Sequence, residues 1–364
     1  MTGPAGPLPP DSTPETPPPD RTPPQAVAPA AEAHTTAAST PDLPPSGIFD
    51  FSIERRAAPA LFVLGWLATL VGGAALIVGI LAPPGVGGRA VFVAGAAALT
   101  IGLVSLAGSQ AVEGRLVAAA GYRGPSPVLL FLAWVPASYV AWVALGLPLE
   151  LLGVHLEGPP AELLYLVVQT AVAIGLVRLL IVGPGVLSWR DIGFCRSAPG
   201  AVADAAWGAV LSGPAILVTA VLATALVTIA GVAPESPLPP TGTASGLLLH
   251  LVSGAAIAPL AEEIVFRGVA ISAWLPVAGR TGAIVRSSVL FAAAHVLFVG
   301  GDSFSNGLAI AAVGFLGRLP IAAFLGWAFL RRGSIWAPLG LHAAFNAVLI
   351  AAAELVVTSG QLAG

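Results

Sequence analysis

Two adjacent acids and an arginine, Glu262, Glu263 and Arg267, stand in a stretch of the chain that is otherwise apolar. The residues before them, from Ser245 to Leu260, carry no formal charge. A charged side chain at membrane depth costs about 3 kcal/mol on insertion scales, so ionisable residues there indicate a functional site. A glutamate in such surroundings is a suitable general base, which makes this segment the first place to expect catalysis.

Two histidine motifs follow the acidic motif. Phe291 and His295 are four residues apart, and so are His342 and Asn346, so each pair lies along one face of a helix. A single histidine in a membrane helix is often only an interhelical hydrogen-bonding residue. Two acids, an arginine, two histidines and an amide together predict one shared site. The candidate catalytic residues are Glu262, Glu263, Arg267, His295, His342 and Asn346.

The composition places these motifs in a membrane protein. Hydrophobic residues make up 56% of the chain and charged residues 9%, with a mean hydropathy of +0.90; a soluble domain carries about 25% charged residues. The net charge of -3 does not favour a nucleic-acid partner, so none is predicted. The single cysteine, Cys195, excludes an intramolecular disulfide. All 15 basic residues are arginines, which indicates a GC-rich, bacterial genome.

Apolar runs of about 20 residues, the length that spans a lipid bilayer, predict the fold class. It is an all-α, polytopic integral membrane helix bundle with about nine transmembrane helices. The predicted spans are Ala60–Leu81, Ala90–Gly108, Val128–Leu147, Ala161–Val182, Trp207–Ile229, Gly246–Trp274, Ala283–Val299, Leu308–Leu330 and Ile335–Val357.

The chain is predicted to have three parts. Residues 1–48 are rich in Pro, Ala and Thr, which predicts a disordered cytoplasmic tail. Residues 49–245 hold the N-terminal transmembrane helices, and residues 246–357 form the catalytic transmembrane core.

The arginines of the connecting segments predict the orientation. They gather in every second loop, which the positive-inside rule assigns to the cytoplasm. A multi-pass cell-membrane protein with a cytoplasmic N-terminus and an external C-terminus follows. At 1.5 Å per residue from the cytoplasmic ends, the two acids lie about 17 Å deep, His295 about 14 Å and His342 about 15 Å. Arg318, near the middle of the eighth span, needs a partner or water, and its role is open between a structural ion pair and a part of the site.

Three motifs in this order resemble the CPBP intramembrane proteases, also called the CAAX prenyl protease 2 or Abi type. They are Glu-Glu-x-x-x-Arg at 262–267, Phe-x-x-x-His at 291–295 and His-x-x-x-Asn at 342–346. The stretch from Gly326 to Pro338 is also similar to that family, and the resemblance covers about residues 246–352. It implies an endopeptidase, often labelled a metalloendopeptidase, for a membrane-embedded or membrane-anchored peptide or protein. Eukaryotic relatives remove the last three residues of prenylated CAAX proteins, a substrate that we do not expect in a bacterial host.

Peptide hydrolysis needs an activated water, a proton carrier and a group that stabilises the oxyanion. We assign Glu262 to the water, His295 and Asn346 to the oxyanion, and His342 to positioning the water or the substrate. The second acid and the arginine hold the local geometry and charge. Zinc is the alternative, with Glu262, His295 and His342 as a His₂Glu ligand set. We favour the metal-free glutamate mechanism slightly, and no cofactor is certain.

Two other functions stay open. The protein is alternatively a non-catalytic bacteriocin self-immunity or scaffold protein, or a proton-coupled transporter whose acids and histidines relay protons. A transporter predicts broken helices in corresponding positions of two halves, which the sequence does not show. A scaffold predicts that the loss of Glu262 is tolerated.

Overall fold

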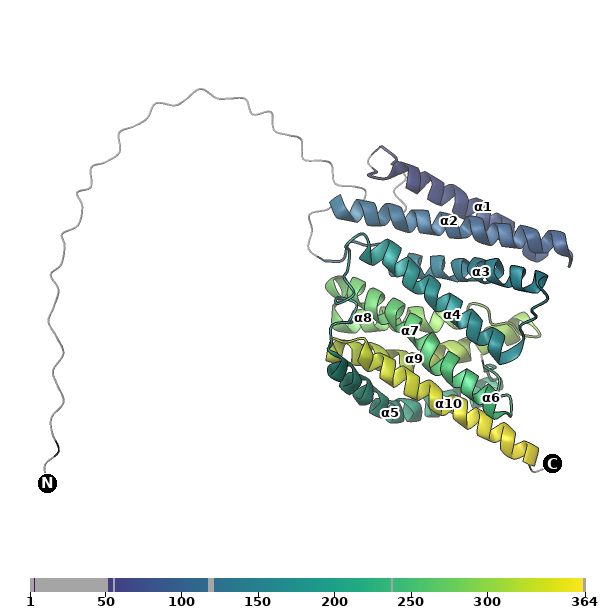
Figure 1. Ribbon diagram of the computed structural model, residues 1–364, viewed down its shortest axis with the longest axis vertical. Coiled ribbons are helices and arrows are strands. Elements are labelled where there is room, and N and C mark those ends of the chain that lie inside the picture. The colour runs from purple at the N-terminus through teal and green to yellow at the C-terminus, as the bar shows by residue number, and fades with distance from the viewer. Residues whose placement is uncertain (1–2, 4–51, 55, 117–120, 237, 363–364) are drawn as a thin grey trace. The chain divides into compact units, whose positions relative to one another are not determined.

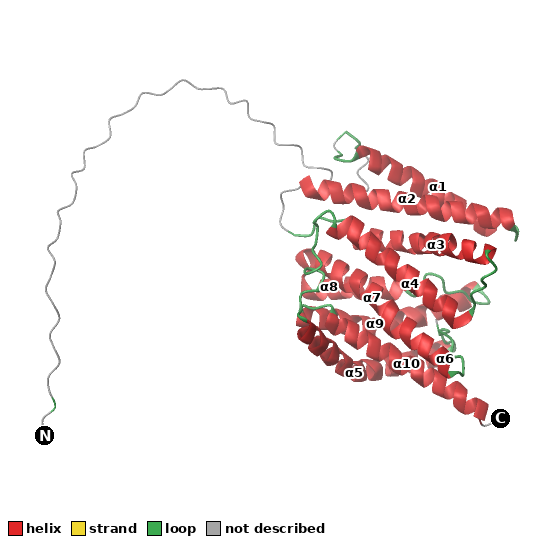
Figure 2. Ribbon diagram, viewed as in Figure 1, coloured by secondary structure: helices red, strands yellow, loops and turns green. Residues whose placement is uncertain are grey.

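The computed structural model describes residue 3 and residues 52–54, 56–116, 121–236 and 238–362. These described residues form helices joined by loops, without a strand among them (Figure 2). The prediction of an all-α helix bundle is therefore confirmed. The predicted tail, residues 1–48, lies outside the described residues apart from Gly3.

Five apolar helices precede the three motifs. They are α1 (Pro59–Leu81), α2 (Val86–Leu116), α3 (Pro127–Leu151), α4 (Gly158–Val177), which continues as the π-helical turn η1 (Arg178–Val182), and α5 (Ala198–Ala230). Four of them, α1, α3, α4 and α5, have a proline in the first turn, where the missing N–H has no partner to lose. Helix α5 ends at Gly231, whose left-handed backbone is typical of a glycine after a helix.

The segment with the three motifs changes its helical type repeatedly. It consists of α6 (Ala244–His250), η2 (Leu251–Ile257), α7 (Ala258–Glu262), η3 (Glu263–Ile271), α8 (Ser272–Ala294), α9 (Phe304–Arg332) and α10 (Trp336–Leu362). The elements η2 and η3 are π-helical, so their turns are wider than the regular α-helical turns on which the spacing argument was based. Such turns are rare and are frequent at functional sites.

Eight helical segments of the described chain are long and apolar enough to cross a membrane. One of them, Ala244–Ala294, has 51 residues, or about 77 Å of helix, against a bilayer core of about 30 Å. The backbone breaks within it at Gly279, where a φ of 65° suits a glycine. The chain then reverses direction. The Ser287 hydroxyl, after the break, donates to the carbonyl of Phe266, before it, at 2.6 Å. This long segment is thus a hairpin of two passes, in agreement with about nine transmembrane helices.

The helices pack in chain order at one side of the bundle and out of order at the other. Helix α1 packs on α2, α2 on α3 and α3 on α4, whereas α5 packs on α9 and α10 (Figure 1). An aromatic cluster lies between these two groups: the Phe266 ring is 5.8 Å from the Phe131 ring and 5.3 Å from the Phe291 ring. This cluster forms the apolar floor against which the motif residues are fixed.

Candidate active site

The helical hairpin brings the first two motifs together. Phe266 on η3 packs edge-on against Phe291 on α8, with the ring centroids 5.3 Å apart. This contact places Glu262, one turn before Phe266, beside His295, one turn after Phe291: Oε1 of the glutamate is 3.9 Å from Nε2 of the histidine. Gly268 allows the hairpin to sit this deep, since a Cβ there would collide with Ile192.

Behind the hairpin, Glu263 and Arg267 form a fully buried ion pair. Both side chains are 0% exposed, and Nη1 of the arginine donates to Oε1 of the glutamate at 3.0 Å. The guanidinium also donates to the Ala322 carbonyl on α9 at 3.3 Å, and it lies over the Phe291 ring at 4.4 Å. A buried charge is tolerated only when it is paired and hydrogen-bonded. The stability of this pair therefore depends on the contacts with Ala322 and Phe291.

The third motif joins the site through the same glutamate oxygen. Nδ1 of His342, on α10, is 2.7 Å from Oε1 of Glu263. An ionised carboxylate can only accept, so Nδ1 carries the proton and Nε2 is free to act as an acceptor. That Nε2 is 3.7 Å from Oε2 of Glu262. The two adjacent acids therefore have different positions: Glu263 holds His342 from behind, and Glu262 faces it across the site.

His295 is held in the same manner as His342 but by the backbone. Its Nδ1 is 2.8 Å from the carbonyl of Phe291, which directs Nε2 towards Glu262. The carboxylate of Glu262 thus stands between two imidazoles and is 19% exposed, whereas that of Glu263 is fully buried. Asn346 lies one turn beyond His342, and one of its N–H groups donates to the Gly254 carbonyl on η2 at 2.7 Å.

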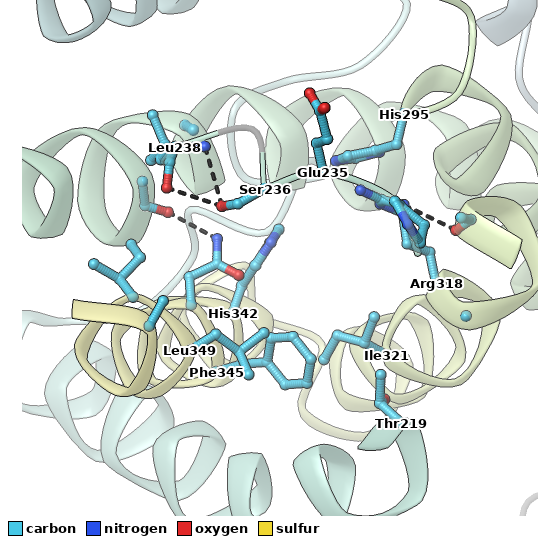
Figure 3. Close-up of a pocket in the computed structure, with 18 of the residues that line it drawn as sticks. Thr219, Glu235, Ser236, Leu238, His295, Arg318, Ile321, His342, Phe345 and Leu349 are labelled. Atoms are coloured by element: carbon cyan, nitrogen blue, oxygen red, sulfur yellow. Dashed lines mark hydrogen bonds between the residues drawn. The ribbon is translucent and has the colours of Figure 1, made fainter. Parts of the chain in front are cut away.

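A cavity of about 680 Å³ lies in front of these side chains. Its wall includes Glu262, His295, His342 and Asn346, and it is otherwise formed mainly by apolar residues of α4, α5, α9 and α10 (Figure 3). Five of the six predicted residues are thereby accounted for at or directly behind one cavity surface, because Glu263 contacts His342 from the buried side. Arg267, the sixth, supports Glu263 and does not line the cavity.

The loop between α5 and α6 forms one edge of the cavity, with Ser236 and Leu238 in its wall (Figure 3). Glu354 on α10 fixes the C-terminal part of this loop. Its carboxylate accepts from the backbone N–H and the hydroxyl of Thr241 and from the N–H of Thr243, each at 2.9 Å. The sequence did not predict the contact between this loop and Glu354, because the two are more than 100 residues apart.

The residues proposed as zinc ligands can be compared with the geometry that zinc requires. Two ligand atoms of a tetrahedral zinc site, each about 2.05 Å from the metal, lie about 3.3 Å apart. The oxygens of Glu262 are 3.9 Å from His295 and 3.7 Å from His342. Among the described residues, no group of three or more His, Cys, Asp or Glu side chains is arranged to hold a metal ion. These separations are about 0.4–0.6 Å wider than a bound zinc would set, and the metal alternative stays a prediction.

Comparison with known proteins agrees with the resemblance found in the motifs. No curated protein and no solved structure matches the chain. Residues 244–348 match a family model described as Rce1-like, type II CAAX prenyl endopeptidase. This range begins at α6 and ends within α10, so it contains all six candidate residues. The part of the chain that carries the site is therefore similar to the Rce1-like, type II CAAX prenyl endopeptidase family, over less than half of the chain.

Proposed function

We propose that the protein is an intramembrane endopeptidase that hydrolyses a peptide bond with a water activated by Glu262. One observation carries the proposal. The carboxylate of Glu262 faces the cavity between Nε2 of His295 and Nε2 of His342, at 3.9 and 3.7 Å. A water about 2.8 Å from both Glu262 and His342 satisfies hydrogen-bond geometry across a 3.7 Å gap.

The two acceptors define how that water would be held. The carboxylate form of Glu262 accepts hydrogen bonds, and Nε2 of His342 is an acceptor because Nδ1 donates to Glu263. The water gives one hydrogen to each of them, which leaves an oxygen lone pair directed into the cavity. The role of Glu263 and Arg267 is therefore to keep His342 in the tautomer that accepts from the water, as a second carboxylate does for a catalytic histidine elsewhere.

The hydrolysis then proceeds in two steps. The water oxygen attacks the carbonyl carbon of the peptide bond, one water proton passes to Glu262, and the carbonyl π electrons move to the oxygen. The resulting oxyanion accepts from the amide N–H of Asn346, and also from Nε2–H of His295 when that imidazole carries its second proton. When the carbon–nitrogen bond breaks, the proton on Glu262 passes to the leaving amine, which regenerates the carboxylate.

The substrate that fits this site is a peptide or protein segment already in or on the membrane. The cavity is mainly apolar and lies among helices of membrane-spanning length. The family is described as a CAAX prenyl endopeptidase. The arginine-only basic composition favours a bacterial host, and hence another membrane-associated peptide. We further propose that the protein resides in the cell membrane with its N-terminus in the cytoplasm and that residues 246–357 are its catalytic core.

The proposal is tested with the purified full-length protein in detergent and a library of apolar peptides, with mass spectrometry of the products. We compare the wild type with Glu262→Gln and with Glu150→Gln, a control at an exposed glutamate on α3 away from the cavity. Cleavage by the wild type and the control, but not by Glu262→Gln, is the expected result. Equal cleavage by Glu262→Gln would refute the proposed role of Glu262. It would instead favour the interpretation of the protein as a non-catalytic scaffold.

A further inference from the structure

Arg318 lies in the cavity wall, and the proposed hydrolysis does not use it. It is 14 residues from each end of α9, Phe304–Arg332, and so about 21 Å along the helix from either end. A basic side chain near a helix end can extend its charge to the membrane surface, but from this depth the surface is out of reach. The positive charge must therefore be stabilised inside the cavity.

The three acids of the cavity wall, Glu162, Glu235 and Glu262, form no ion pair with it, and the charge of Glu262 acts on it only at longer range. The guanidinium donates from Nη1 to the Gly314 carbonyl at 2.9 Å, and no described carboxylate lies within 4.0 Å of its nitrogens. Glu162, another acid of the cavity wall, is paired with His250 at 2.9 Å. Glu262 is flanked by its two imidazoles. An unpaired charge at membrane depth is costly, which points to a function for the one at Arg318.

The surroundings of Arg318 leave its guanidinium accessible from the cavity. A Cβ on Gly314 would come within 3.1 Å of Nη1, whereas a Cβ on Gly317 would meet open space. In Figure 3 the Arg318 side chain lies next to His295 and is directed to the same part of the cavity. A ligand bound at Arg318 would therefore lie beside the residues proposed for the hydrolysis.

We propose that Arg318 binds a carboxylate of the substrate, so that the enzyme selects peptides that bring a negative charge into a mainly apolar cavity. This inference rests on the proposed function, since it names the group by which the same site would recognise its peptide. The planar guanidinium fork matches the two oxygens of a carboxylate. That carboxylate has two sources, the C-terminus of the peptide and the side chain of an Asp or Glu, which the experiment separates.

The competing role for Arg318 is to stabilise the oxyanion of the reaction. An oxyanion forms from every peptide, charged or not, so this role would make the loss of Arg318 equally harmful for all substrates. A carboxylate-binding role makes the loss selective. The ratio of kcat/KM for a carboxylate peptide to that for its neutral amide distinguishes the two roles, whereas activity alone does not.

The experiment uses a peptide cleaved by the wild type, synthesised with a C-terminal carboxylate or a C-terminal amide and with Glu or Gln at each internal position. A charged hydrogen-bonded pair predicts a preference of about 10- to 100-fold for one carboxylate over its amide. Arg318→Gln should reduce this ratio to about 1, and Arg318→Lys, which keeps the charge but loses the fork, should keep part of it. Arg331→Gln, at an exposed arginine of the same helix, is the matched control and should keep all of it.

A ratio that Arg318→Gln leaves unchanged, with both peptides cleaved more slowly, would overturn the inference in favour of the oxyanion role. The absence of any carboxylate preference in the wild type would overturn it as well. Binding of the same peptides to the Glu262→Gln protein, measured by fluorescence anisotropy, separates this inference from the proposed function. A carboxylate preference in binding that Arg318→Gln abolishes supports the inference even if no hydrolysis occurs, and equal binding of acid and amide refutes it.

Discussion

Arg267→Ala is expected to destabilise the protein as well as to reduce its activity. The substitution removes the ion pair with Glu263, the hydrogen bond to the Ala322 carbonyl and the contact with the Phe291 ring. Glu263 remains 0% exposed, with His342 as the hydrogen-bond partner of Oε1 and no partner for Oε2. An uncompensated carboxylate is thus left in the interior of the bundle.

Breaking a buried ion pair by removal of one partner costs about 3–5 kcal/mol. Since about 1.4 kcal/mol corresponds to a factor of ten, the ratio of folded to unfolded protein should fall by roughly two to four orders of magnitude. Glu263→Gln in the same chain removes the stranded charge and should restore part of this loss. It should restore little activity, because a neutral amide does not fix the tautomer of His342 as a carboxylate does.

Unfolding is followed by tryptophan fluorescence during titration with sodium dodecyl sulfate in mixed micelles, since the chain contains 8 tryptophans. The comparison includes the wild type, the two single variants and the double variant, with Arg331→Ala as a control at an exposed arginine. The reasoning would be refuted if Arg267→Ala were as stable as the control. It would also be refuted if the double variant were less stable than the wild type by the sum of the two single effects, because the cycle would then show no coupling between the two residues.

Four further predictions concern catalysis, metal, topology and the tail. Each of three single substitutions, Glu262→Gln, His295→Ala and His342→Ala, should lower turnover by at least about 100-fold without loss of folding. The fold-loss of a combined variant should be smaller than the product of the single fold-losses. A chelator such as 1,10-phenanthroline should leave the peptidase rate unchanged, and a rate lost with chelator and restored by added zinc would instead support the His₂Glu ligand set. Reporter fusions at Arg190 and Ser236, on the two sides of α5, should report opposite faces of the membrane, and the same face for both would contradict the predicted orientation. Deletion of residues 1–48 should leave hydrolysis of a short peptide nearly unchanged in a turnover assay, and a collapse in turnover of well-folded protein would make the tail part of the enzyme.

The sequence alone was sufficient to predict the helix bundle and which polar residues gather at one level within it. The hydropathy runs predicted the spans because a bilayer imposes a nearly fixed length on apolar helices. The i,i+4 spacings predicted the pairing of Glu263 with Arg267, which the structure places at 3.0 Å. The estimated depths brought Glu262, His295 and His342 to one level, and these residues do line one cavity. The catalytic roles assigned to them stay predictions.

Tertiary structure decided which residue contacts which within that level. Depth along a helix says nothing about how the helices are rotated and packed sideways, so the contact between Glu263 and His342 had no sequence signal. The break at Gly279 and the π-helical turns around α7 were likewise invisible to an argument based on regular α-helical spacing. Arg318 shows the same limit most clearly. Its sequence position showed that the charge needs a partner, and only the packed structure shows that the described chain provides none within ion-pair distance and that the guanidinium lies in the wall of the cavity.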